Sequence, residues 1–139
     1  MEHNFLKSFQ TVVGLGVDLL EVSRLKKKIQ RHGENFLNRV FTEKEQSYCR
    51  EKLNCYGHYA SRFCAKEAFV KALGWGISNR CSWLDIEVFH DEKGRPNLNI
   101  SEKVYTYLPW SRITTHLSIS DEKHYACATV ILLVPLEYL

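Results

Sequence analysis

Several features that define common protein classes are absent from this 139-residue sequence. The longest apolar run, residues 126–133, is interrupted by Thr129 and is far shorter than the roughly 20 residues that a membrane-spanning helix needs. The chain begins with MEHNFLK, which lacks the apolar core of a secretion signal. We therefore expect a cytoplasmic protein that does not enter a membrane.

No cysteine pattern points to a disulfide framework or to a zinc site. The five cysteines are odd in number and scattered, and none belongs to a CxxC pair. The chain also lacks a Gly-x-x-x-x-Gly-Lys phosphate loop, a Gly-x-Gly-x-x-Gly dinucleotide fingerprint and the Gly-x-Ser-x-Gly elbow of serine hydrolases. These absences argue against a serine hydrolase and against the two commonest nucleotide-binding loops.

Positive charge is concentrated in one segment of the chain. The net charge is +3, but residues 22–32 alone contribute +5 and contain no acidic residue. The cations of this segment are Arg24, Lys26, Lys27, Lys28 and Arg31. The pattern indicates a docking surface for an acidic partner, although a merely solvated helix face would carry the same charges.

Helical patterns dominate the first half of the chain, after a β-branched strand over residues 11–20 that we expect to end at Asp18. Helices are predicted for residues 21–32, 35–40, 42–53 and 55–73. Strands are predicted in the second half for residues 83–90, 97–100, 113–120 and 124–134, with a short helix over 101–108. Helices followed by hairpins indicate an α+β fold in a single domain over residues 1–139.

The strongest indication of a functional site lies in residues 62–76. In the helix predicted there, Glu67 falls within an apolar stripe and Lys71 follows one turn later. A carboxylate in an apolar stripe is costly unless it has a partner or a metal ion. Gly74 and Gly76 end the helix and allow a close backbone approach or a positive φ. Together these features indicate a site for a charged ligand.

Asp18 offers a second carboxylate on an apolar strand. Asp18 and Glu67 together would suit a hard cation with oxygen ligands, Mg²⁺ above all. In the alternative interpretation, Asp18 caps the following helix and Glu67 pairs with Lys66 or Lys71. His116 is a further candidate acid or base, although a histidine in a strand is more often packed or exposed without a catalytic role.

Five motifs occur in order along the chain. The first is GLGVDLLEVSR at residues 14–24, and the second and most specific is RFCAKEAFVKALGWGI at residues 62–77. DIEV and GRP follow within residues 85–96, and HLSIS stands at residues 116–120. Across nearly the whole chain, this series resembles the motifs of bacterial holo-[acyl-carrier-protein] synthases.

The resemblance implies a 4′-phosphopantetheinyl transferase fold, with an antiparallel sheet packed against a long helix. It implies Mg²⁺-dependent transfer of phosphopantetheine from coenzyme A to a serine of apo acyl carrier protein, with release of adenosine 3′,5′-bisphosphate, in support of fatty acid biosynthesis. It also implies a homotrimer with active sites between subunits. Neither a nucleic acid nor a membrane is implied as a partner.

The resemblance further implies roles for single residues by their positions in the motifs. Asp18 and Glu67 would bind Mg²⁺, and Lys71 would contact the phosphates of coenzyme A. Arg24 and Lys28 would meet the acidic carrier protein. The other cofactor-binding residues would be Arg62, Gly74, Gly76, Arg95, Pro96 and His116.

One departure from the family leaves the general base open. Many members have a histidine where this chain has Asp121, directly after the HLSIS motif. The nucleophilic serine would belong to the carrier protein, and a base must accept its proton. We expect Glu67 to do so through a metal-bound water molecule, with Asp121 or His116 as the second candidate.

A non-enzymatic module that binds RNA or an acidic protein through the basic segment is the competing hypothesis. Such a module requires no role for Asp18 or Glu67. The placement of Glu67 in an apolar stripe favours the enzyme, because a docking surface does not need a carboxylate there.

Overall fold

The computed structural model describes residues 9–139 of the chain. Its helices are α2 (Val22–His32), α3 (Glu34–Val40), α4 (Glu43–Arg50), α5 (Cys55–Ala72) and α6 (Glu102–Tyr105), with short 3-10 turns η1 (Trp83–Asp85) and η2 (Leu136–Tyr138). Its strands are β1 (Gln10–Glu21), β2 (Ile86–His90), β3 (Pro96–Ile100), β4 (Thr114–Asp121) and β5 (Tyr125–Pro135). No helix among residues 9–139 is both long enough and apolar enough to cross a membrane.

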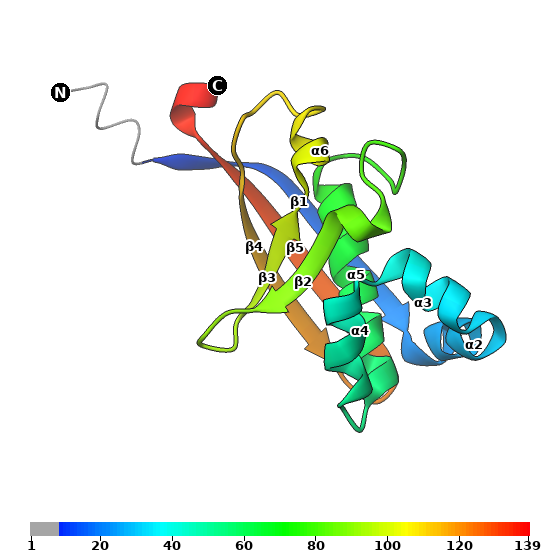
Figure 1. Cartoon of the computed structure of the whole chain (residues 1–139). Coiled ribbons are helices and arrows are strands. Elements are labelled where there is room, and N and C mark those ends of the chain that lie inside the picture. Colours follow the sequence, from blue (N-terminus) through cyan, green and yellow to red (C-terminus); the bar gives the residue numbers. More distant parts are fainter. Residues whose placement is uncertain (1–8) are drawn as a thin grey trace.

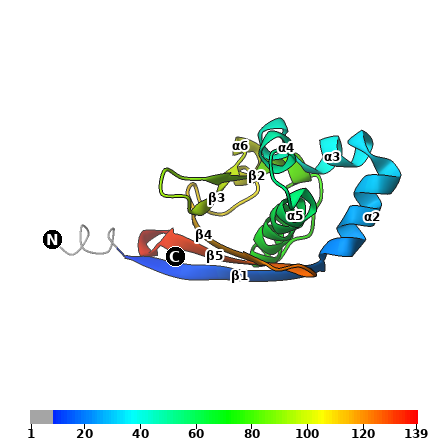
Figure 2. The same ribbon diagram turned by 90° about the horizontal axis from the view of Figure 1, so that it is seen from below.

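The strands form two antiparallel sheets (Figure 1). The larger has the order β1-β5-β4, and the smaller is the hairpin of β2 and β3. Seen along the edge of the larger sheet, α5 lies on one face of it and α4 lies beyond α5 (Figure 2). The hairpin of β2 and β3 lies on the same side of the sheet, beside α5, with β3 next to β4. The predicted α+β fold, with an antiparallel sheet against a long helix, is confirmed.

Four predicted boundaries differ from the structure by three residues; one is the end of the helix predicted for residues 42–53, which stops at Arg50. The first strand continues past Asp18 to Glu21, because this stretch pairs with β5 throughout. Residues 83–85 form a 3-10 turn rather than a strand, since the Asp85 side chain accepts from the Ser82 backbone N–H at 2.8 Å. The helix after Ser101 ends at Tyr105 instead of continuing to residue 108.

Helix α5 is the centre of the molecule, and most of its surface is buried. Of the predicted apolar side, Tyr56, Phe63 and Leu73 are only partly buried, whereas residues on the side expected to be polar are buried. Arg62 is 2% exposed and Lys66 is fully buried. The expectation of a polar face opposite the apolar stripe is therefore wrong for this helix, because that side is buried as well.

Two glycines of β1 allow that strand to lie directly against α5. A Cβ atom on Gly14 would stand 2.0 Å from the Ala72 carbonyl oxygen, and one on Gly16 would stand 1.9 Å from that of Ala68. Real Cβ atoms do not approach backbone oxygens so closely. The two glycines therefore set the distance between β1 and α5, and with it the position of Asp18 two residues later.

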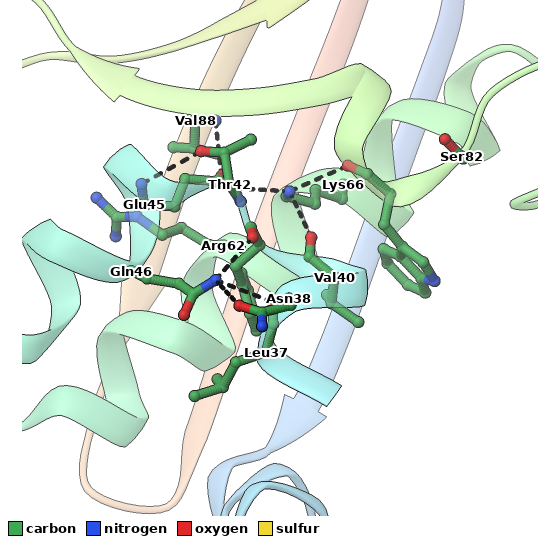
Figure 3. Close-up of polar contacts among 12 residues, drawn as sticks. Leu37, Asn38, Val40, Thr42, Glu45, Gln46, Arg62, Lys66, Ser82 and Val88 are labelled. Carbon is green, nitrogen blue, oxygen red and sulfur yellow. Dashed lines mark hydrogen bonds and ion pairs between the residues drawn. The ribbon is translucent and has the colours of Figure 1, made fainter. Parts of the chain in front are cut away.

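The buried Lys66 ammonium connects four parts of the chain (Figure 3). Its Nζ atom lies 2.7 Å from Glu45 Oε1 at the start of α4, and it donates to the carbonyl oxygens of Val40 at 2.7 Å and Trp83 at 3.0 Å. Burial lowers the pKa of Lys66, and the charge of Glu45 opposes that shift. The alternative in which Lys66 pairs with Glu67 is wrong.

Glu45 is fully satisfied in this arrangement. Its Oε1 atom also accepts from the Thr42 backbone N–H at 2.9 Å, which completes the predicted capping box of α4. Its Oε2 atom accepts from the Val88 backbone N–H at 2.9 Å. A capping residue recognisable in the sequence thus also ties α4 to α5 and β2.

Substitution of Gly16 by alanine tests the close contact between β1 and α5. The new methyl group would overlap the Ala68 carbonyl, so we expect the free energy of unfolding to fall by about 2 kcal/mol or more. Gly76→Ala is the matched control, since its methyl group enters open space. Chemical denaturation measures both variants, and equal stability of the two would contradict the contact.

Lys66→Met tests the buried ion pair. The variant leaves the Glu45 carboxylate buried without its cation, so we expect a loss of about 3–5 kcal/mol in the free energy of unfolding. The double variant Glu45→Gln/Lys66→Met removes both charges and should recover part of that loss. If urea denaturation gives the single and double variants the same stability, the unpaired charge is not the cause.

Candidate active site

Asp18 and Lys71 meet at the open edge of the larger sheet. Lys71 Nζ lies 3.0 Å from Asp18 Oδ1 and donates to the Val17 carbonyl oxygen at 3.1 Å. The Asp18 side chain is 15% exposed and that of Lys71 is 49% exposed. The bond to Asp18 raises the pKa of Lys71, which therefore stays protonated. Asp18 does not cap α2, whose N-cap is Glu21.

Glu67 lies one turn before Lys71 on the same helix and close to Asp18. Burial raises the pKa of the Glu67 carboxyl above its ordinary value, and the charge of Asp18 raises it further. Lys71 acts in the opposite direction. Two carboxylates from β1 and α5, far apart in the sequence, are therefore brought together beside one ammonium group.

The chemistry of this group suits a hard divalent cation. Both side chains offer carboxylate oxygens, and the Val17 carbonyl lies next to them. The Cys64 thiol also hydrogen-bonds Asp18, but burial raises its pKa and keeps it protonated, and a protonated thiol is a poor metal ligand. Within residues 9–139 no three His, Cys, Asp or Glu side chains gather as a complete metal cage. Mg²⁺ is commonly bound in this way, by one or two carboxylates with substrate phosphates and waters completing the shell.

Gly74 follows Leu73, the C-cap residue of α5. Gly74 has φ of 74°, its N–H bonds the Lys71 carbonyl at 2.9 Å, and the Trp75 N–H bonds that of Val70 at 2.8 Å. This is the pair of bonds of a Schellman motif, in which the left-handed residue favours glycine. A Cβ atom on Gly74 or Gly76 would meet nothing within 4 Å. No described residue therefore packs so closely on either position that glycine is required there.

Arg62 lies on the other side of α5, against the ring of Tyr48 from α4. Its guanidinium stands 4.1 Å from the centre of the Tyr48 ring and donates to the His58 carbonyl oxygen at 3.3 Å. The Nε atom of Arg62 is buried and has no hydrogen-bond partner among the described residues. His90 stacks on Tyr48 at 5.1 Å. A nearly buried cation with a free donor is thus available at this end of the helix.

Arg95 and Pro96 lie at the turn between β2 and β3. Arg95 Nε lies 3.0 Å from Asp91 Oδ2, and the Arg95 side chain is otherwise exposed. Gly94 takes a positive φ of 79° in this turn. Pro96 begins β3 opposite His90. This hairpin tip projects from the body of the molecule (Figure 1).

The chain does not bring His116 to the two carboxylates. His116 pairs with Ile131, whereas Asp18 pairs with Ala128 of the same strand, β5. Ala128 is buried under α5, and Ile131 belongs to the alternate positions that face outward. His116 and Asp18 therefore occupy opposite faces of the sheet.

Asp121 is also separated from Glu67. It ends β4, with β5 between it and β1. Its electrostatic neighbour is His58 in the first turn of α5: burial lowers the pKa of His58, and the charge of Asp121 acts to raise it. Within one chain, neither of the second candidates for the base stands at the Asp18–Glu67 pair.

The basic segment forms α2, and its apolar positions pack inward as predicted. Val22, Leu25 and Ile29 are buried, while the lysines and arginines are exposed. A cavity of about 220 Å³ opens beside the helix. Its lining residues are Leu20, Arg24, Leu25, Lys28 and Phe63. The predicted docking surface thus combines cations with an apolar hollow.

The sequence analysis missed the partners that hold the site residues in place. Tyr48 under Arg62 and Glu45 beside Lys66 come from α4, whose predicted role was only that of a helix. The capping-box pattern identified Glu45 as a capping residue but did not indicate its ion pair with Lys66. Nothing in the pattern indicated Tyr48, because pairing between α4 and α5 depends on how the connecting loop folds.

Known proteins of similar sequence identify the family of this chain. A model of the 4′-phosphopantetheinyl transferase superfamily matches residues 14–130. The holo-[acyl-carrier-protein] synthase of Chlamydia pneumoniae is 44% identical over 122 residues, covering 88% of this chain and 98% of that protein. The synthase of Halothermothrix orenii is 45% identical over 119 residues, covering 85% of this chain and 94% of that protein.

Solved structures of such synthases share the fold. The Bacillus anthracis synthase, solved in complex with coenzyme A (3′,5′-ADP), is 36% identical with a TM-score of 0.74, covering 88% of this chain and 96% of that one. The Helicobacter pylori synthase in complex with coenzyme A is 30% identical with a TM-score of 0.75, covering 85% and 98%. The chain therefore belongs to the holo-[acyl-carrier-protein] synthases of the 4′-phosphopantetheinyl transferase superfamily.

Proposed function

We propose that this chain transfers the 4′-phosphopantetheine group from coenzyme A to a serine of apo acyl carrier protein and releases adenosine 3′,5′-bisphosphate. The observation that carries the proposal is the convergence of Asp18, Glu67 and Lys71 in a fold shared with synthases solved with coenzyme A. A module that only docks RNA or protein does not need these three side chains together.

We propose that Asp18 and Glu67 hold Mg²⁺. Their oxygen ligands fit that ion, and two protein ligands leave room for phosphate oxygens. The bound ion would screen the charge of the pyrophosphate and stabilise the leaving bisphosphate.

Lys71 would contact the phosphates of coenzyme A from the same side. It lies one turn from Glu67, and its half-exposed side chain can reach a ligand without a change in the backbone. Its ammonium would stabilise charge on the leaving group. Positioning and electrostatics of this kind carry most of the catalysis in phosphoryl-group transfer. Arg62 is buried on the other side of α5, so we do not place it at the phosphates that Lys71 would contact.

Glu67 remains the first candidate for the base. Burial and the charge of Asp18 raise its pKa, which makes it a better proton acceptor than an ordinary carboxylate. The proton of the carrier serine would pass to Glu67 as the serine oxygen bonds to phosphorus. The bond between that phosphorus and the bisphosphate breaks, and its electron pair leaves with the bisphosphate.

A homotrimer would complete the site. The outward face of β1 exposes four apolar side chains to between 50% and 64% of their area: Val12, Leu15, Val17 and Leu19. Exposed apolar patches of this kind mark interaction surfaces. We propose that a second copy packed against β1, an edge strand of the larger sheet, brings its own His116, Arg95, Pro96 and Asp121 to the first copy's Asp18.

The acidic carrier protein would dock on α2. Arg24 and Lys28 both border the apolar hollow beside that helix, so charge and apolar contact would act together. We propose a cytoplasmic enzyme that serves fatty acid biosynthesis, with a protein partner rather than a nucleic acid or a membrane.

Glu67→Gln tests the assignment of the carboxylates. We expect transfer to fall by roughly 100-fold or more, because the variant loses both the metal ligand and the base while its volume stays the same. Mass spectrometry of apo carrier protein incubated with coenzyme A and Mg²⁺ detects the added phosphopantetheine. Glu102→Gln, on exposed α6, is the matched control and should retain transfer. Wild-type rates in Glu67→Gln would exclude the assignment.

Arg24→Glu/Lys28→Glu tests the docking surface. The reversed charges should raise KM for the carrier protein by about tenfold, with KM for coenzyme A unchanged and a weaker dependence on salt. Steady-state rates at several ionic strengths measure these effects. Lys44→Glu, an exposed lysine on α4, serves as the control. An equal change in both KM values would argue against docking at α2.

A further inference from the structure

Lys71 makes contacts that compete with its proposed role at the phosphates. Its ammonium is held by two acceptors of β1, Asp18 Oδ1 at 3.0 Å and the Val17 carbonyl oxygen at 3.1 Å. Asp18 is also one of the two proposed metal ligands. One carboxylate thus faces two cations, the lysine and the divalent ion.

The net charge around Asp18, Glu67 and Lys71 depends on which ligands bind there. Asp18 and Glu67 carry two negative charges and Lys71 one positive charge, so the group is attractive to a cation as a whole. A divalent ion at Asp18 would nevertheless be repelled by an ammonium group bonded to the same carboxylate. Phosphate oxygens nearby would offer Lys71 another partner, and 49% of its side-chain area is exposed to such a ligand.

We propose that Lys71 competes with the divalent cation for Asp18, and that the phosphates of coenzyme A relieve this competition by drawing the ammonium away. The inference rests on the proposed metal site. It makes metal and coenzyme A bind cooperatively, with Lys71 as the residue that couples them. By reciprocity, the metal would favour coenzyme A by the same factor.

The test measures metal binding rather than activity. Mn²⁺ binding to the full chain is followed by electron paramagnetic resonance, with and without coenzyme A, after subtraction of the Mn²⁺ that coenzyme A binds alone. Without coenzyme A, Lys71→Met should bind Mn²⁺ about fivefold more tightly than the wild type. With coenzyme A, the difference should shrink to about twofold or less, because Lys71 has then left Asp18 in the wild type.

Two outcomes would overturn the proposal. One is Mn²⁺ binding by Lys71→Met that is no tighter than wild type without coenzyme A. The other is an equal gain with and without coenzyme A, which would show only a general effect of charge. Lys71→Gln, measured in parallel, guards against an effect of the methionine side chain itself.

Lys103→Met is the matched control. Lys103 pairs with Asp85 at 2.6 Å, and the exposed fractions of these two side chains, 45% and 15%, nearly equal those of Lys71 and Asp18. Its loss should leave Mn²⁺ binding unchanged. Mn²⁺ binding that does not depend on Glu67 would overturn the metal site and this inference together. Binding that depends on Glu67 but not on Lys71 would overturn this inference alone.

Discussion

The contact between β1 and α5 is the constraint on which the rest of the structure depends. Gly14 and Gly16 let the strand backbone touch the helix backbone at Ala72 and Ala68, with no side chain between them. The same contact fixes Asp18 beside the turn of α5 that carries Glu67 and Lys71. A larger residue at either glycine would move the carboxylate away from its partners, so packing and function rest on the same two positions.

The geometry of helix α5 places two charged residues that are adjacent in the sequence, Lys66 and Glu67, in different environments. Lys66 and Glu67 are neighbours in the sequence, yet they point about 100° apart around the helix. Lys66 is buried toward α4 and β2, where Glu45 and two carbonyl oxygens satisfy it. Glu67 faces β1 and stays partly open to solvent. One residue holds the layers together, and the next is free to meet a ligand.

The larger sheet divides the remaining site residues between its faces. Its inner face packs on α5 and presents Asp18, while its outer face carries His116 and the exposed apolar residues of β1. This division gives a physical reason for the homotrimer that we propose, since a single chain cannot bring both faces to one ligand. It also leaves Glu67 as the base candidate already in place within the chain.

The sequence by itself determined most of the helices and strands and the chemically active side chains that they carry. Periodicity and capping patterns located the long helix, the capping box of Thr42 and Glu45, and the strands of the second half, because these depend on neighbouring residues. The motifs identified the family and named Asp18, Glu67 and Lys71. Only the tertiary structure decided that Lys71 pairs with Asp18, that Lys66 pairs with Glu45, and that His116 lies across the sheet from Glu67. These facts depend on strand register and on the approach of segments more than 20 residues apart, which local patterns do not encode.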